Sequence, residues 1–66
     1  MIDDVLGKLE KVVLWRSRVE WTDCATRLET AAEASFDVEE IRLLNATRRL
    51  VEAAADYRQV YAEVTA

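Results

Sequence analysis

The chain has 66 residues, of which 52% are hydrophobic and 33% charged, and its formal net charge is −4. A chain this short buries only about 60% of the surface that it exposes when unfolded, so a partner chain, a disulfide or a metal is normally needed for stability. A single cysteine, Cys24, and the lack of histidine exclude an intrachain disulfide and leave no recognisable metal-ligand set. The acidic balance also disfavours a large nucleic-acid footprint, which normally requires a basic surplus.

Targeting and membrane signals are the next feature to consider. The N-terminal segment MIDDVLGKLEK lacks the charged-then-apolar order of a secretory signal. No run approaches the 18 apolar residues of a membrane-spanning helix. We therefore expect a soluble, cytoplasmic protein without membrane contact. Arginine outnumbers lysine seven to two and alanine is abundant, a composition typical of a GC-rich bacterial or phage genome.

The first predicted element is a helix over about residues 4–34, which Asp3 or Asp4 can cap. Its apolar residues fall on three flanks, whereas one partner helix covers a stripe only about 100° wide. The three flanks consist of Ile2, Leu6, Leu9, Val13, Cys24, Leu28 and Ala31; of Val5, Val12, Trp15 and Val19; and of Leu14, Trp21, Ala25 and Leu28. This helix is therefore too apolar around its middle for a monomeric hairpin.

A turn is predicted at about residues 35–37, within EASFDVEE. Asp37 followed three residues later by Glu40 is typical of a helix start with a capping box. Phe36 precedes the cap and can fold back onto Ile41 as a hydrophobic staple. A second helix then covers about residues 38–64, and the short link makes the two helices antiparallel. The sequence thus predicts an all-α, single-domain, two-helix antiparallel hairpin.

The second helix carries the more regular apolar seam, which repeats at alternating steps of three and four over three heptads. Its members are Leu43, Ala46, Leu50, Ala53, Tyr57, Val60 and Val64. The alanines let a facing helix approach closely, so we expect this seam to form the hairpin contact. The opposite face is expected to be solvated and holds Asn45, Arg48, Arg49, Glu52, Asp56, Gln59 and Glu63.

Two such hairpins can pack as a homodimer that forms a four-helix bundle and buries both flanks of the first helix. This architecture resembles that of Rop, the small plasmid-copy-control, RNA-binding hairpin dimer. The resemblance covers the length, a single Asp-capped bend and small residues at heptad positions. It implies a four-helix-bundle dimer, and it carries over no RNA-contacting residue.

The segment LWRSRVEW, residues 14–21, combines two tryptophans with two arginines. On a helix, Trp15 and Trp21 point about 240° apart, so they do not form one stacking platform for nucleic-acid bases. We expect Trp21 to close the intramolecular core. We expect Trp15 to anchor a contact with another subunit or with a foreign protein. The alternative is that the Trp15 ring simply lies on the surface, partly covered. The predicted interface consists of Val12, Trp15, Arg16, Arg18 and Val19.

Glu20 is the one carboxylate that projects into an apolar stripe, where an unpaired charge would cost several kcal/mol. Arg16 lies one turn before it, and Arg48 or Arg49 can reach it across the hairpin. We therefore predict a core ion pair of Glu20 with Arg16 or Arg49 that sets the register of the two helices.

The hinge end of the hairpin is strongly acidic, with no basic residue between Arg27 and Arg42. An acidic tip can dock on a basic surface of another protein through steered association. The alternative is a set of carboxylates that simply suits the positive end of a helix dipole. The predicted acidic tip consists of Glu29, Glu33, Asp37, Glu39 and Glu40.

Catalytic motifs are missing from the sequence. No histidine is present to activate Cys24, and neither a Glu-x-x-His motif nor a glycine-rich phosphate loop occurs. We therefore expect a non-enzymatic protein–protein interaction module without cofactors, a small bacterial or phage-type regulator or inhibitor that binds a larger protein. Two alternatives stay open: a structural oligomerisation subunit of a larger assembly, or a nucleic-acid-binding hairpin dimer that uses Lys8, Lys11, Arg16 and Arg18 doubled by symmetry.

Overall fold

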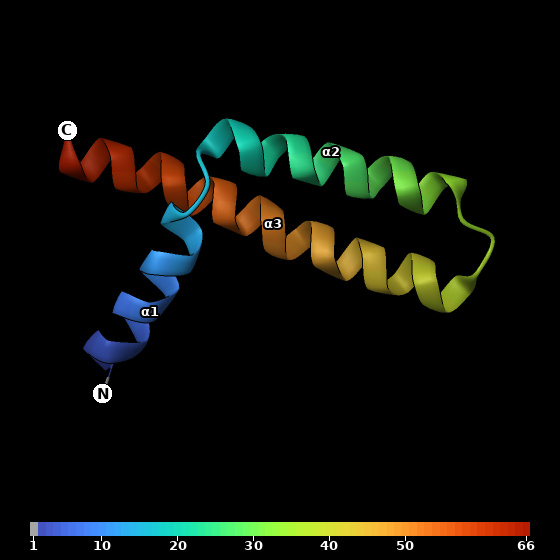
Figure 1. The fold of residues 1–66 in the computed structure, drawn as a ribbon, viewed down its shortest axis with the longest axis horizontal. Helices are drawn as coiled ribbons and strands as arrows, with labels where there is room; N and C mark the ends of the chain where they lie inside the picture. Colours follow the sequence, from blue (N-terminus) through green and yellow to red (C-terminus); the bar gives the residue numbers. More distant parts are fainter. Residues whose placement is uncertain (1) are drawn as a thin grey trace.

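The computed structural model describes residues 2–66, with side chains from residue 4 onward. Three helices follow one another in this range: α1 (Ile2–Leu14), α2 (Arg18–Ala34) and α3 (Val38–Thr65). Helices α2 and α3 lie antiparallel and side by side, and α1 extends at an angle from the open end of this hairpin, away from α2 (Figure 1). The predicted all-α class is confirmed. The predicted two-helix hairpin is not, because the described chain has a third helix.

The helix predicted over residues 4–34 is interrupted at residues 15–17. Ser17 adopts an extended backbone, and its hydroxyl oxygen accepts a hydrogen bond of 3.2 Å from the amide of Glu20. The Glu20 carboxylate in turn accepts a bond of 3.4 Å from the amide of Ser17, which completes a capping box. These two bonds satisfy backbone donors at the start of a new helix at Arg18. The prediction of one continuous helix is therefore wrong.

The start of α1 also differs from the predicted one. This helix begins at Ile2, so Asp4 lies within its first turn and does not occupy the cap position. The alternative cap, Asp3, lies outside the residues whose side chains the structure describes.

The hairpin turn lies at residues 35–37, between Ala34 at the end of α2 and Val38 at the start of α3. Asp37 caps α3, and its carboxylate accepts a hydrogen bond of 3.0 Å from the amide of Glu39. Phe36 is fully exposed. The hydrophobic staple predicted between Phe36 and Ile41 is therefore not formed.

The core of the hairpin is thin. Among residues 4–66, only Ala25 and Val51 are buried. Half-buried side chains continue the facing stripes of the two helices, namely Trp21, Cys24, Leu28 and Ala32 on α2, and Ile41, Leu44, Arg48, Ala55 and Arg58 on α3. The two arginines take positions that an apolar residue would fill in a larger core, since their long aliphatic stems can cover apolar surface. The Nε of Arg48 is itself buried, 3.6 Å from the Glu52 carboxylate and without a hydrogen bond among the described residues.

The regular seam predicted for the second helix faces away from α2. Its members Leu43, Leu50 and Val64 are 68%, 72% and 77% exposed, and its other four members are exposed as well. Asn45 and Arg48, which we expected on a solvated face, are half-buried instead. A link of three residues leaves α3 little freedom to rotate about its axis. The half-buried stripe that begins with Ile41 and Leu44 therefore meets α2, although the opposite stripe, which contains the seam, is more apolar.

Candidate interaction surfaces

The predicted interface surrounds the break between α1 and α2, and we refer to it as the junction surface (Val12, Trp15, Arg16, Arg18 and Val19). Trp15 is 81% exposed, and the other four side chains are exposed too. The break places Val12 on α1 and Val19 on α2, so the single helical stripe assumed in the prediction does not exist. What the five residues have in common is that they lie in or near the link of residues 15–17 between α1 and α2.

The second tryptophan belongs to the internal structure of the chain. Trp21 is half-buried, and its indole Nε1 donates a hydrogen bond of 2.8 Å to the carbonyl oxygen of Val13. Val13 lies in the last turn of α1, where backbone carbonyls have no partner within the helix. Trp21 therefore caps α1 from α2, while Trp15 points outward.

The predicted core ion pair lies on the surface. Nη1 of Arg16 is 3.2 Å from Oε2 of Glu20, and both side chains are 54% exposed. Arg49 does not contribute to this pair among the described residues. Hydrogen bonds from the backbone and the hydroxyl of Ser17, followed by the contact with Arg16, lower the pKa of Glu20. Glu20 therefore caps α2 and does not set the register of a buried seam.

The acidic tip is exposed at all five of its carboxylates. Two of them are engaged within α3, because Asp37 caps the helix and Glu39 lies 3.9 Å from Arg42. Sequence reasoning missed the apolar part of this tip. Phe36 is fully exposed and Val38 is 67% exposed, so the tip combines negative charge with apolar surface. The position of Phe36 directly before the cap is typical of a hydrophobic staple, so no sequence signal indicated its exposure.

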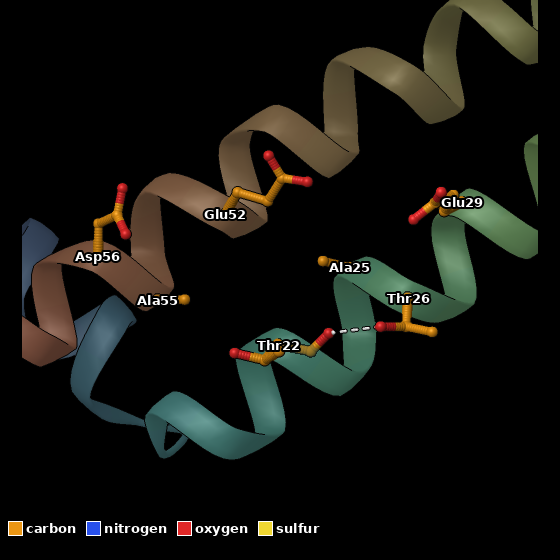
Figure 2. Close-up of a pocket in the computed structure, with 7 residues that line it drawn as sticks. All are labelled: Thr22, Ala25, Thr26, Glu29, Glu52, Ala55 and Asp56. Atoms are coloured by element: carbon orange, nitrogen blue, oxygen red, sulfur yellow. Dashed lines mark hydrogen bonds between the residues drawn. The ribbon is translucent and has the colours of Figure 1, made fainter.

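An open groove runs between α2 and α3. Figure 2 shows Glu29 at one end of this groove on α2 and Glu52 and Asp56 along α3, with the small Ala25 and Ala55 between the helices. Among the residues with described side chains, no group of three histidine, cysteine, aspartate or glutamate residues comes together to hold a metal ion. The groove therefore presents separate carboxylates without a defined ligand set.

The seven seam residues of α3 form a second apolar surface, which we call the outer seam (Leu43, Ala46, Leu50, Ala53, Tyr57, Val60 and Val64). The ring of Tyr57 stacks on that of Tyr61, with 6.3 Å between the ring centroids and an angle of 20° between the ring planes. An exposed charged residue immediately precedes every second member of the seam, that is, Leu43, Leu50, Tyr57 and Val64. These flanking charges are Arg42, Arg49, Asp56 and Glu63. Sequence reasoning assigned three of them to a solvated face and did not relate them to the seam.

No protein-family model, curated protein or solved structure matches this chain. The three helices also differ from the two-helix hairpin on which the resemblance to the Rop dimer was based. None of the helices in residues 2–66 combines the length and the apolar character that a bilayer-spanning segment requires.

Proposed function

We propose that the chain is a non-enzymatic protein–protein interaction module, a small regulator or inhibitor of bacterial or phage type. In this proposal it acts as a homodimer and binds a larger protein through the junction surface. The observation that carries the proposal is the exposure of its apolar side chains. Only Ala25 and Val51 are buried in the described chain, whereas Trp15 is 81% exposed. Exposed apolar surface on this scale usually marks an interface.

The junction surface has the composition of a binding hot spot. Tryptophan and arginine are enriched among the residues that contribute most to protein–protein affinity, and Trp15 is followed directly by Arg16 and, two positions later, by Arg18. The link that carries Trp15 is held between the capping box of Ser17 and the Trp21–Val13 hydrogen bond. A side chain presented from such a fixed link loses little conformational entropy on binding, which favours affinity.

Self-association is the second part of the proposal. The outer seam lies on α3, and the junction surface lies beside the link between α1 and α2, so the chain has one apolar surface for a second copy and another for a target. A dimer would present the junction surface twice. A target with two matching sites would then be bound with avidity beyond that of a single contact.

The experiment that tests the target contact places a photo-crosslinking amino acid at position 15 of the full chain, in the cells from which the chain comes. Arg27 provides the matched control position, because its side chain is 81% exposed and lies outside both apolar surfaces. We expect a discrete adduct with a larger protein from position 15 and none from position 27. Excess wild-type chain should compete for this adduct, whereas Trp15→Glu should not.

Two results would contradict the proposal. An adduct that contains only copies of this chain would place Trp15 in the subunit interface and leave the target contact without support. A complex that disappears on nuclease treatment, and that weakens steeply between low and physiological salt, would indicate the nucleic-acid-binding alternative. A contact anchored by Trp15 should persist at moderate salt, because apolar burial is not screened by ions.

A further inference from the structure

We infer that the outer seam packs against the outer seam of a second copy of this chain, with the two α3 helices antiparallel. This inference rests on the homodimer part of the proposed function and specifies its surface, direction and register. It uses none of the residues of the junction surface. Two independent features of α3 support this pairing: the sizes of the seam side chains and the order of the flanking charges.

The first four seam residues alternate in size, since Leu43 and Leu50 are large and Ala46 and Ala53 are small. In an antiparallel coiled coil, the first apolar position of each heptad packs against the second apolar position of the partner helix. One register places Leu43 against the partner's Val60, Ala46 against the partner's Tyr57, and Leu50 against the partner's Ala53. In this register both alanines meet a large side chain. The space between the helices is then filled evenly, as native packing requires.

The flanking charges select the same register. Arg42 and Arg49 lie in the first half of α3, while Asp56 and Glu63 lie in its second half. All four occupy the same heptad position, and in an antiparallel pair this position faces the same heptad position, in a different heptad, of the partner helix. Such charges set orientation and partner choice. This register places Arg42 opposite the partner's Glu63, and Arg49 opposite the partner's Asp56. A shift by one heptad would instead place Arg49 opposite the partner's Arg49, or Asp56 opposite the partner's Asp56. Twofold symmetry doubles both pairs.

A parallel arrangement satisfies neither feature. Each seam residue would then meet its own copy, so the alanines at positions 46 and 53 would face alanines and leave gaps. Arg42 and Arg49 would face the partner's Thr47 and Ala54, which carry no charge. Asp56 would face the partner's Tyr61, so no carboxylate–guanidinium pair would form. The antiparallel arrangement is therefore the one that the side chains support.

The residues needed for this pairing are available in the single chain. No ion pair within the described residues involves Arg49 or Asp56. Arg42 has only a long contact of 3.9 Å with Glu39, and Glu63 accepts a hydrogen bond of 3.0 Å from Gln59 and keeps its charge unpaired. Every residue of the seam is exposed, and even Tyr57, its most covered large residue, is 38% exposed.

A charge swap tests the register. The dimer dissociation constant of the full chain is measured by analytical ultracentrifugation for wild type, Arg49→Glu, Asp56→Arg and the double variant. Each single reversal opposes like charges twice in the dimer, so we expect it to weaken dimerisation at least roughly tenfold. The double variant should recover most of the wild-type affinity, because the pairs are restored with exchanged signs. Arg27→Glu changes the net charge as Arg49→Glu does and should have no effect.

Disulfide trapping tests the direction independently. In a Cys24→Ser background, Leu43→Cys and Val60→Cys chains are mixed and oxidised under mild conditions. The antiparallel register predicts the mixed disulfide as the main product, whereas a parallel pair predicts disulfides between identical chains. Circular dichroism of every variant checks that the helices are retained.

The outcomes separate this inference from the proposed function. A wild-type chain that is monomeric at high concentration overturns both the inference and the proposed homodimer, but leaves the target contact of Trp15 to its own test. A wild-type dimer whose charge swap does not rescue, or whose cysteines link identical positions, overturns the inference alone.

Discussion

The indole nitrogen of Trp21 donates a hydrogen bond of 2.8 Å to the carbonyl oxygen of Val13, from the first turn of α2 to the last turn of α1. The side-chain hydrogen bonds within α2 and α3 link residues no more than four positions apart, whereas this bond spans eight. It therefore fixes the direction in which α1 leaves the hairpin. The other contacts of the chain determine how stable this orientation of α1 is.

Trp21→Phe should loosen α1 from the hairpin. The aromatic ring is kept, but the N–H that satisfies the Val13 carbonyl is lost, and a hydrogen bond of this kind contributes about 1 kcal/mol to stability. We expect a decrease of that size in the free energy of unfolding, measured by urea denaturation. Hydrogen exchange should become faster at the amides of α1 and stay unchanged in the middle of α3.

Trp15→Phe is the matched control for this change, because Trp15 is 81% exposed and its replacement should leave stability and exchange unaltered. Equal protection of α1 in Trp21→Phe and in wild type would show that the indole hydrogen bond does not hold the helix.

Ser17→Ala should destabilise the start of α2. The substitution removes the hydroxyl that accepts the Glu20 amide at 3.2 Å, and loss of an N-cap side chain costs about 0.5–2 kcal/mol. Ser17→Asp keeps an acceptor at the same position and should remain close to wild type. The two variants are compared by urea denaturation, and equal stabilities would contradict the role of the cap.

Acidification should remove the contribution of Glu20 to stability. Its pKa is lowered in the folded chain, mainly by the hydrogen bonds from Ser17, so the ionised carboxylate is the form that stabilises the fold. This contribution is complete above the unfolded pKa of about 4.5 and is lost as the pH falls through the lower folded pKa. We expect the difference in unfolding free energy between wild type and Glu20→Gln to shrink over this range. A difference that is constant with pH would exclude an ionic role for Glu20.

Gly7→Ala should stabilise α1. Apart from its chain neighbours and the surrounding helix backbone, no heavy atom lies within 4 Å of the position that the added methyl group would take. Glycine inside a helix is less stable than alanine by about 0.5–1 kcal/mol, so we expect a gain of that order in the unfolding free energy. Dimer affinity should stay the same, because the inferred pairing uses α3. A weaker dimer would place α1 within the subunit interface.

The start of α3 was readable from the sequence, whereas the break before α2 was overlooked. Asp37 lies just before an acidic first turn, and the structure places the cap of α3 there. Ser17 and Glu20 have the spacing of a capping box too, but they lie in a segment without glycine or proline, where the apolar residues continue on both sides. The apolar pattern alone predicts a continuous helix through this segment. The local hydrogen bonds of Ser17 decided the outcome.

The face of α3 that meets α2 was not readable from apolar content. The stripe of Leu43 and Leu50 is more apolar than that of Ile41 and Arg48, yet it faces outward. Periodicity identifies the stripes of a helix but not which of them the turn directs inward. In a chain with so thin a core, an apolar seam can equally serve a second molecule, and sequence alone does not separate the two uses.

The link between α1 and α2 also determines how the chain responds to a protease. Arg16 and Arg18 are exposed on either side of Ser17, and Arg16 lies outside both helices. Trypsin therefore has an accessible peptide bond after Arg16, while the arginines of α3 are held within a long helix. Cleavage there would separate α1 from an intact α2–α3 hairpin and remove the Trp15 side chain together with α1. The same cut would leave the outer seam whole, so a brief digestion divides the chain into a part that carries Trp15 and a part that carries the seam.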